Sequence, residues 1–413
     1  MSVESLDVRL RFAPDREHRV GTLAMVGRDF VFQYAESFLG LNLAISPFHL
    51  PVRPGVQVFD GRGRLDVFGV FDDAMPDNWG HRLVDRHFQK TLGRPPRILE
   101  RLAYVGERAM GAMTFHPAQE VTPLPEHELD LAGLGVQAWD FDTDLIEDAL
   151  PELRRLGGSS GGARPKVLVG LPVDARDPKP KILPGDGDLP PGYAHWIVKF
   201  NARAEGPDAG PLEFAYAETA AAAGVEVPEH RLLQTDIGRF FAVRRFDRPS
   251  PGQRLHLHSA AGLLHADFRT PGTEYDTLFR LTEALTRDYA QKLELFRRAC
   301  LNVLACNRDD HLKNFAFLMG PDGAWHLAPF FDFTFNEGPN GWQTLSVAGE
   351  GQNPRREHLQ KLAAQADLRP RDTDEIIEQV RGAVAGLVPL ANGLKVSKAK
   401  TARLRSRLKE LDA

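Results

Sequence analysis

The chain has 413 residues, of which 42% are hydrophobic and 26% charged, and its formal net charge is −5 at pH 7. This composition is ordinary for a globular protein of two or three domains, and it excludes the strongly basic surface of a general nucleic-acid binder. Its two cysteines exclude a disulfide framework; with neither a signal peptide nor an apolar run long enough to cross a bilayer, we expect a cytoplasmic enzyme without membrane contact.

Residues 1–120 are predicted to form a β-rich N-terminal domain. The segments 6–12, 20–26 and 30–34 alternate apolar and polar side chains, the pattern typical of strands. A helix then begins at the run 76–80, because proline and aspartate favour the first turn of a helix. Its Trp79 lies at helical spacing from other apolar residues, so we expect it in the core.

Residues 121–250 are the second predicted domain. A helix over 145–156 ends in a glycine-rich segment, 157–166, after which a strand begins. Glycine lets backbone N–H groups approach phosphate oxygens closely, and hydroxyl, Lys and Arg side chains add donors. The segment is a candidate phosphate-binding loop, although its composition also fits a flexible linker and it lacks the order of a Walker A motif. Its predicted nucleotide contacts are Gly161, Gly162, Ala163, Arg164 and Lys166.

The apolar strand over 195–200 carries Lys199 near its end. The aliphatic stem of such a lysine packs in the core while its charged head needs a partner, which an ATP phosphate supplies. A surface strand lysine is the alternative interpretation. The helix that follows, over 212–224, offers Glu213 and Glu218 as ion-pair partners for Lys199. Glycine-rich loop, strand, lysine and acidic helix follow in the order of a kinase small lobe.

A buried strand from residue 240 leads into an extended segment, because the residue before Pro249 is disfavoured in a helix. In a two-lobed kinase this segment is the hinge beside the adenine, so Arg245, Phe246 and Asp247 are predicted ATP contacts, with Asp247 accepting from the ribose. The rest of the chain, 251–413, is mostly helical in pattern. The predicted fold class is therefore α+β: a protein-kinase-like two-lobed fold with an additional β-rich N-terminal domain and a mostly helical C-terminal lobe.

The third domain contains the strongest chemical signal. A buried helix over 289–305 ends in the polar run 307–314, and a hairpin with its turn at 320–323 leads on to Asp332. The hairpin is expected to bring Asp332 back beside Asn314. For Asp309, Asp310 and Asn314 taken alone, a helix cap in a polar loop is the alternative.

Phosphoryl transfer needs a carboxylate for the attacking hydroxyl, and an amide plus a carboxylate suffice to hold Mg²⁺ beside the phosphates. Asp309 fits the first role, while Asn314 and Asp332 fit the second. Lys313 is placed to neutralise the γ-phosphate during transfer. His311, in the same loop, is interpreted as a hydrogen-bonding residue near the nucleotide, because Asp309 already supplies the base.

Together these segments resemble the HipA toxins, serine/threonine kinases of bacterial toxin-antitoxin systems. The resemblance covers nearly the whole chain, through the segments 76–80, 105–108, 159–166, 244–247, 307–314 and 329–332 together with Lys199. It implies that Asp309 is the catalytic base, that Asn314 and Asp332 bind Mg²⁺, and that Lys199 binds an ATP phosphate. The autophosphorylated serine of the family aligns with Ser159, and Ser160 stands beside it as a second candidate.

The resemblance also implies partners: a small DNA-binding antitoxin that neutralises the kinase, operator DNA reached through that antitoxin, and a protein substrate such as an aminoacyl-tRNA synthetase. A phosphate on Ser159 or Ser160 adds about −1.5 to −2 charges to a loop that should hold a triphosphate, which favours ejection of the loop. A small-molecule phosphotransferase on a related fold and a catalytically idle co-regulator remain alternatives. Intact Lys199, Asp309, Asn314 and Asp332 argue against a catalytically idle co-regulator.

Overall fold

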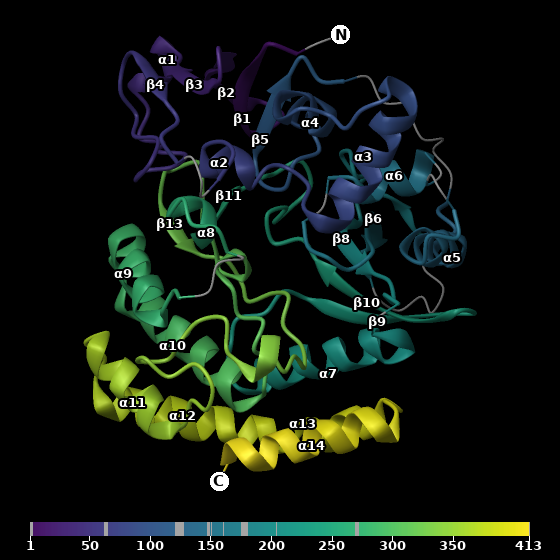
Figure 1. Cartoon of the computed structure of the whole chain (residues 1–413), viewed down its shortest axis with the longest axis vertical. Coiled ribbons are helices and arrows are strands. Elements are labelled where there is room, and N and C mark those ends of the chain that lie inside the picture. The colour runs from purple at the N-terminus through teal and green to yellow at the C-terminus, as the bar shows by residue number, and fades with distance from the viewer. Residues whose placement is uncertain are drawn as a thin grey trace. The chain divides into compact units, whose positions relative to one another are not determined.

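A computed structural model (Figure 1) describes residues 3–61, 65–119, 128–146, 149, 151–159, 161–174, 181–203, 205–268 and 272–412. The chain divides into two compact units. The first comprises Met1–Pro207, Leu233–Asp267 and Leu318–Ala324, and the second comprises Asp208–Leu232, Phe268–Phe317 and Trp325–Ala413. Within the described residues, every helix is too short or too polar to span a bilayer.

The N-terminal part of the first unit is an antiparallel sheet with the strand order β4-β3-β2-β1-β5. On β1, Leu6, Val8 and Leu10 are fully buried and alternate with more exposed residues, as expected of a strand with one face on the core. The predicted β-rich N-terminal part is thus confirmed. The elements of this part are β1 (Ser5–Ala13), β2 (Arg16–Val26), β3 (Asp29–Tyr34), α1 (Glu36–Leu39), β4 (Val56–Val58), α2 (Gly69–Asp72), α3 (Asn78–Leu92), α4 (Ile98–Val105) and β5 (Met113–His116).

A second sheet of the first unit has the order β7-β6-β8-β10-β9. Its strands are β6 (Lys166–Pro172), β7 (Leu183–Pro184), β8 (Tyr193–Lys199), β9 (His230–Thr235), which begins in the second unit, and β10 (Gly238–Arg244). Helices α5 (Leu131–Asp142) and α6 (Pro151–Gly157) contribute to the core of this sheet, and so does Trp79 of α3, which is fully buried as predicted. The predicted domain limits at residues 120 and 250 remain a prediction, and the unit boundaries do not coincide with them.

Buried histidines fix the segment after β10 to the N-terminal part of the first unit. This segment contains β11 (His256–Ser259) and α8 (Ala260–Leu263). His256 Nε2 donates to the Ile45 carbonyl (2.8 Å), and His265 Nε2 accepts from the Gly69 N–H (3.0 Å). Because His265 accepts a hydrogen bond through Nε2, its imidazole is neutral.

The second unit is mostly helical, as predicted for this part of the chain. Its longest helices, α10 and α12, contact each other, and Figure 1 shows the C-terminal helices in yellow-green and yellow beside them. Asp288 caps α10 by accepting from the Ala290 N–H (2.8 Å), close to the predicted start of this helix. The helices are α7 (Ala209–Ala222), α9 (Tyr275–Thr286), α10 (Tyr289–Leu304), α11 (Arg356–Gln365), α12 (Pro370–Ala385), α13 (Leu387–Gly393) and α14 (Lys398–Asp412).

Three short 3₁₀ helices and a small hairpin complete the described elements. The 3₁₀ helices are η1 (Gly206–Asp208), η2 (Leu312–Asn314) and η3 (Pro339–Gly341), and the hairpin strands are β12 (Ala316–Met319) and β13 (Trp325–Leu327). The Ala328 N–H donates to the Ala316 carbonyl (2.9 Å) at the base of the hairpin. The chain therefore returns after the hairpin to the level of η2, as the sequence predicted.

Candidate active site

The polar run after α10 is held at its first residues by the backbone. Cys306 has φ +57, the left-handed conformation that commonly ends a helix. The Arg308 N–H then donates to the Asn336 carbonyl (2.9 Å), while the Asn336 N–H donates to the Cys306 carbonyl (3.0 Å). The two ends of the segment 306–336 are thus joined at one neck, and the predicted catalytic residues lie on the loop that this neck closes.

Asp310 is the buried anchor of this loop. Its side chain accepts hydrogen bonds from the Tyr275 hydroxyl (2.6 Å), Gln343 Nε2 (3.1 Å) and the N–H groups of Thr344 (3.0 Å) and Leu345 (3.3 Å). Burial raises the pKa of Asp310 to about 6, although these hydrogen bonds act in the opposite direction. From the sequence, Asp310 was assigned no role beyond that of a helix cap; a pair of adjacent acids was the only signal that one of them faces inward.

Asp309 lies beside this anchor with a side chain that is 55% exposed. Its Oδ1 is 4.0 Å from His311 Nε2. Partial desolvation raises the pKa of Asp309, His311 lowers it and the carboxylate of Asp332 raises it further. Solvent screening limits the energetic weight of this shift. An exposed carboxylate with a raised pKa is suited to accept a proton from a hydroxyl group.

Asn314 connects the predicted base, Asp309, to the second predicted metal-binding residue, Asp332. It is 7% exposed, and its Nδ2 donates to the Asp309 carbonyl (2.8 Å) and lies 3.5 Å from the Asp332 carbonyl. Asp332 has an exposed side chain and a φ of +55, a conformation that is uncommon outside glycine and that recurs at functional sites. The structure therefore brings Asp309, Asn314 and Asp332 together within one unit.

The donor atoms at this place fit Mg²⁺. Nδ2 of Asn314 donates to the Asp309 carbonyl, so Oδ1 of the same amide faces away from that carbonyl and is the atom that can bind a metal ion. An amide oxygen and the carboxylate of Asp332 are hard ligands, and magnesium takes its remaining ligands from water and phosphate. In the described parts of the chain no group of three or more His, Cys, Asp and Glu side chains forms a complete protein metal site. The magnesium role of Asn314 and Asp332 stays a prediction.

His311 and Lys313 both lie near Phe268. The His311 and Phe268 rings are 4.9 Å apart at their centroids, and Lys313 Nζ is 5.1 Å from the centre of the Phe268 ring. Such a distance permits a cation–π interaction. His311 Nδ1 is buried and makes no hydrogen bond to any described residue. The hydrogen bond predicted for His311 is therefore not observed at this atom.

In the first unit, the Gly-rich loop, residues 157–166, links α6 to β6. Gly161 and Ala163 are exposed, and Gly162 has a φ of +93, which glycine adopts without strain. Arg164 Nε donates to Glu205 (2.6 Å) and Lys166 Nζ donates to the Gly161 carbonyl. Ser159 is 2% exposed, and Ser160 lies outside the described residues.

Lys199 is the last residue of β8. It pairs with Lys166 of β6 on one side and with Phe241 of β10 on the other, and its Nζ is 6.0 Å from the centre of the Phe241 ring. The side chain is 6% exposed, so its stem lies in the sheet as expected. Of the two predicted acidic partners, Glu213 is buried, whereas Glu218 binds His230 Nε2 (2.9 Å). Glu218 is thus used within the second unit.

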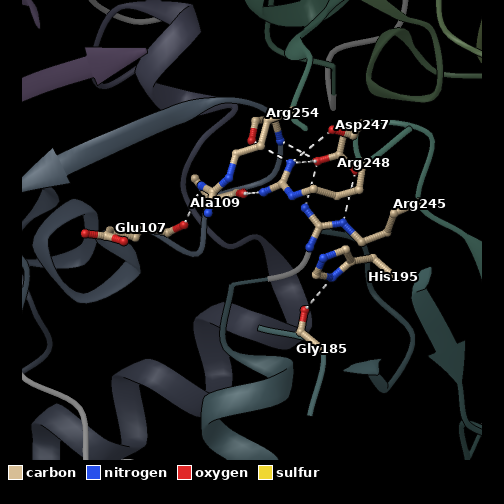
Figure 2. A network of polar contacts seen from close by, with 9 residues as sticks. Glu107, Ala109, Gly185, His195, Arg245, Asp247, Arg248 and Arg254 are labelled. Atoms are coloured by element: carbon tan, nitrogen blue, oxygen red, sulfur yellow. Dashed lines mark hydrogen bonds and ion pairs between the residues drawn. The ribbon is translucent and has the colours of Figure 1, made fainter. Parts of the chain in front are cut away.

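The predicted hinge segment forms a buried charge cluster (Figure 2). Asp247 is fully buried and accepts hydrogen bonds from Arg245 (2.7 and 3.0 Å), Arg248 (2.7 Å) and the Gly111 N–H (2.7 Å). Burial alone raises the pKa of Asp247, but the two guanidinium groups outweigh it and hold this pKa well below its usual range. Arg248 also donates to the Ala109 carbonyl (3.1 Å), which ties the segment to the loop before β5.

The burial of this cluster disfavours two of the predicted ATP contacts, Arg245 and Asp247. The side chain of Asp247 is 1% exposed and its carboxylate is enclosed by guanidinium groups and a backbone amide, so in this arrangement a ribose hydroxyl does not reach it. Arg245 is equally buried and is bonded to Asp247. Phe246, between them, is only partly buried. The nucleotide roles of Arg245 and Asp247 remain predictions that this geometry disfavours.

Comparisons with known proteins bear on the whole chain. Residues 158–387 match the family model described as HipA-like C-terminal domain, and residues 15–116 match the HipA N-terminal domain. A curated protein of Haemophilus influenzae named "Putative kinase" is 25% identical over 227 residues, which span 51% of this chain and 65% of that protein. The aligned region thus covers less than two thirds of this relative.

Two solved structures are similar. HipA of Shewanella oneidensis MR-1, in a complex with HipB and operator DNA, shares 16% identity with a TM-score of 0.69, over 98% of this chain and 95% of that one. The Helicobacter pylori proinflammatory kinase CtkA shares 13% identity over 53% of this chain and 84% of that one, with a TM-score of only 0.39. The first likeness supports the kinase-like fold with a β-rich N-terminal part. Because a HipA family model covers more than half of its length, the chain belongs to the HipA family.

Proposed function

We propose that this chain is an ATP- and Mg²⁺-dependent serine/threonine protein kinase of the HipA type. The observation that carries the proposal is the meeting of Asp309, Asn314 and Asp332, drawn together by the Asn314 amide. An exposed carboxylate beside two oxygen ligands for magnesium is the set of groups that phosphoryl transfer requires. A small-molecule phosphotransferase and a catalytically idle co-regulator are the alternatives, and incubation with labelled ATP distinguishes them from a protein kinase.

In this proposal the reaction moves one proton and one phosphoryl group. Asp309 accepts the proton of the attacking hydroxyl as its oxygen forms a bond to the γ-phosphorus, and the bond from that phosphorus to the ADP oxygen breaks. Asn314 and Asp332 would hold Mg²⁺, which when bound neutralises charge on the phosphates. Lys313 contributes a further positive charge near the transferred group.

The phosphate contacts of the nucleotide are assigned to the first unit. Lys199 and the exposed backbone of the Gly-rich loop are proposed to bind the triphosphate, supported by the glycines at 161 and 162 that allow close approach. Asp310 contributes through the rigidity that it gives to the catalytic loop. It touches no substrate.

The proposed substrates are serine or threonine hydroxyls of a protein and the chain's own Ser159 or Ser160. Ser159 is 2% exposed, so phosphorylation of this residue requires the Gly-rich loop to open. The complex reported for the Shewanella relative supports a small DNA-binding antitoxin as the partner, with DNA contacted through it. An aminoacyl-tRNA synthetase as substrate is implied by the HipA resemblance alone.

The test is incubation of the purified protein with radiolabelled ATP and Mg²⁺, alone and with a cell lysate. Asp309→Ala is compared with wild type, and Asp374→Ala, at an exposed aspartate of α12, serves as the control. We expect label on protein for wild type and the control and none for Asp309→Ala, with phosphopeptides that contain Ser159 or Ser160. Label only in the small-molecule fraction favours the metabolite kinase, and no ATP turnover favours the idle co-regulator.

A further inference from the structure

The Gly-rich loop is held by a helix that precedes it by some eighty residues in the chain. The Gly162 N–H donates to the carboxylate of Asp77, and the Gly162 carbonyl accepts from the Trp79 N–H (3.3 Å). Gly162 is therefore bound on both of its backbone polar groups by the start of α3. The preceding residue, Gly161, also packs against Asp77, since a Cβ on Gly161 would lie 3.4 Å from Asp77 Oδ2.

Asp77 serves the loop and not its own helix. It occupies the N-cap position of α3, where an aspartate usually accepts from an N–H of the first helical turn. Here its side chain makes no capping hydrogen bond, and the adjacent Asn78 has a φ of +20. The carboxylate thus accepts a hydrogen bond from the loop and does not cap its own helix.

Trp79 fixes the other end of the same loop. It is fully buried and its Nε1 donates to the carbonyl of Lys166, the first residue of β6. A Cβ at Gly157 would lie 3.0 Å from this Nε1 and 2.9 Å from Leu83 of the same helix. Helix α3 consequently contacts the loop at its beginning, at its middle and at its end.

We propose that Asp77 is a positioning residue for the Gly-rich loop: by binding the Gly162 N–H it holds the backbone in the shape in which the exposed residues Gly161 and Ala163 receive the nucleotide phosphates. This inference rests on the proposed function for its nucleotide part. The N-terminal part of the chain, through α3, thereby becomes a component of the phosphate-binding site. A charge-assisted hydrogen bond to a backbone amide is among the stronger contacts available to such a loop.

The test compares Asp77→Ala and Asp77→Asn with Asp85→Ala. Asp85 lies on the same helix, is 38% exposed and pairs with Arg101, so its removal perturbs α3 without touching the loop. Hydrogen exchange of the peptide covering 157–166 is the first measurement and needs no nucleotide. We expect faster exchange in this peptide for Asp77→Ala, an intermediate effect for Asp77→Asn, and the wild-type rate for Asp85→Ala.

The second measurement separates binding from chemistry. For Asp77→Ala the KM for ATP is expected to rise about 10-fold, the factor given by loss of one charged hydrogen bond, with kcat within about 2-fold of wild type. Unchanged exchange, or a fall in kcat at constant KM, overturns the inference. If exchange rises but the wild type neither binds nor uses ATP, the proposed function fails while the positioning role stands. Should Asp77→Ala not fold, Asp77→Asn decides the outcome by the same two measurements.

Discussion

Asp247→Asn tests whether the buried charge cluster is structural. The asparagine oxygen can replace Oδ2, which accepts from Arg245, Arg248 and the Gly111 N–H, but its NH₂ group then faces Arg245 Nε. The Asp247, Arg245 and Arg248 side chains are only 1%, 2% and 6% exposed, so two guanidinium charges lose their counter-ion in a buried place. Breaking a buried ion pair in this way costs about 3–5 kcal/mol, a large part of the ~5–15 kcal/mol that stabilises a typical domain.

Urea unfolding, followed by fluorescence and circular dichroism, measures this loss. As a control, Asp188→Asn removes the exposed ion pair with Arg11 (3.1 Å) and is expected to change the free energy of unfolding by no more than about 1 kcal/mol. Adding Arg248→Met to Asp247→Asn should recover part of the loss, because one of the uncompensated charges is removed. The KM for ATP of the folded variant is expected to stay near the wild-type value. An unfolding free energy equal to wild type, or a KM raised 10-fold without loss of stability, would refute the reasoning and restore Asp247 as a nucleotide contact.

Three further predictions concern the catalytic loop and acid stability. Asp309→Asn should lower kcat by about 10²–10⁴ while the unfolding midpoint stays within error, since the side chain is 55% exposed; equal losses for Asp374→Asn would contradict this. Asn314→Ala should raise the Mg²⁺ concentration for half-maximal activity, measured by magnesium titration; an unchanged titration curve would remove Asn314 from the metal site. Burial lowers the pKa of His256 to about 3 and of His265 to about 4. Both histidines stay neutral in the folded protein, while in the unfolded chain they take up protons below about pH 6.5. Their contribution to the free energy of unfolding is therefore complete above that pH and decreases as the pH falls. At pH 5 the loss is about 2 kcal/mol per histidine. Urea midpoints at pH 5 and pH 7 check this, and equal midpoints would show that these histidines titrate normally.

Local patterns predicted the elements around the site well. The helix expected over 289–305 is observed as Tyr289–Leu304, and the turn signal at 320–323 does join two short strands that return the chain to Asn314. Trp79 is buried as its helical spacing indicated. These features depend on residues that are close in sequence, where periodicity and turn chemistry are informative.

Contacts between distant segments were not predictable in the same way. The spacing to Asn314 and the resemblance singled out Asp309, but the burial of Asp310 was not predictable, because it depends on Tyr275, Gln343 and the backbone near Thr344. The hinge interpretation missed the burial of Asp247 for a similar reason, since its amide partner, Gly111, lies in the N-terminal part. The composition of residues 157–166, which also fits a flexible linker, did not indicate that Asp77 binds this loop.

The neck at Cys306, Arg308 and Asn336 joins the two ends of the catalytic segment at its base, away from the tip of the hairpin. The backbone carbonyls of Asp309 and Asp332 both lie beside Asn314 Nδ2 near this base, while the turn around Asp322 lies at the far end of the hairpin. Because Arg16 donates to the Pro321 carbonyl (2.8 Å) and a Cβ at Gly323 would lie 2.0 Å from the Asn42 carbonyl, we expect an insertion at that turn to disturb these contacts before it disturbs the base. A chain cleaved there should keep Asp309 and Asp332 assembled, so the two fragments would complement each other as a split enzyme.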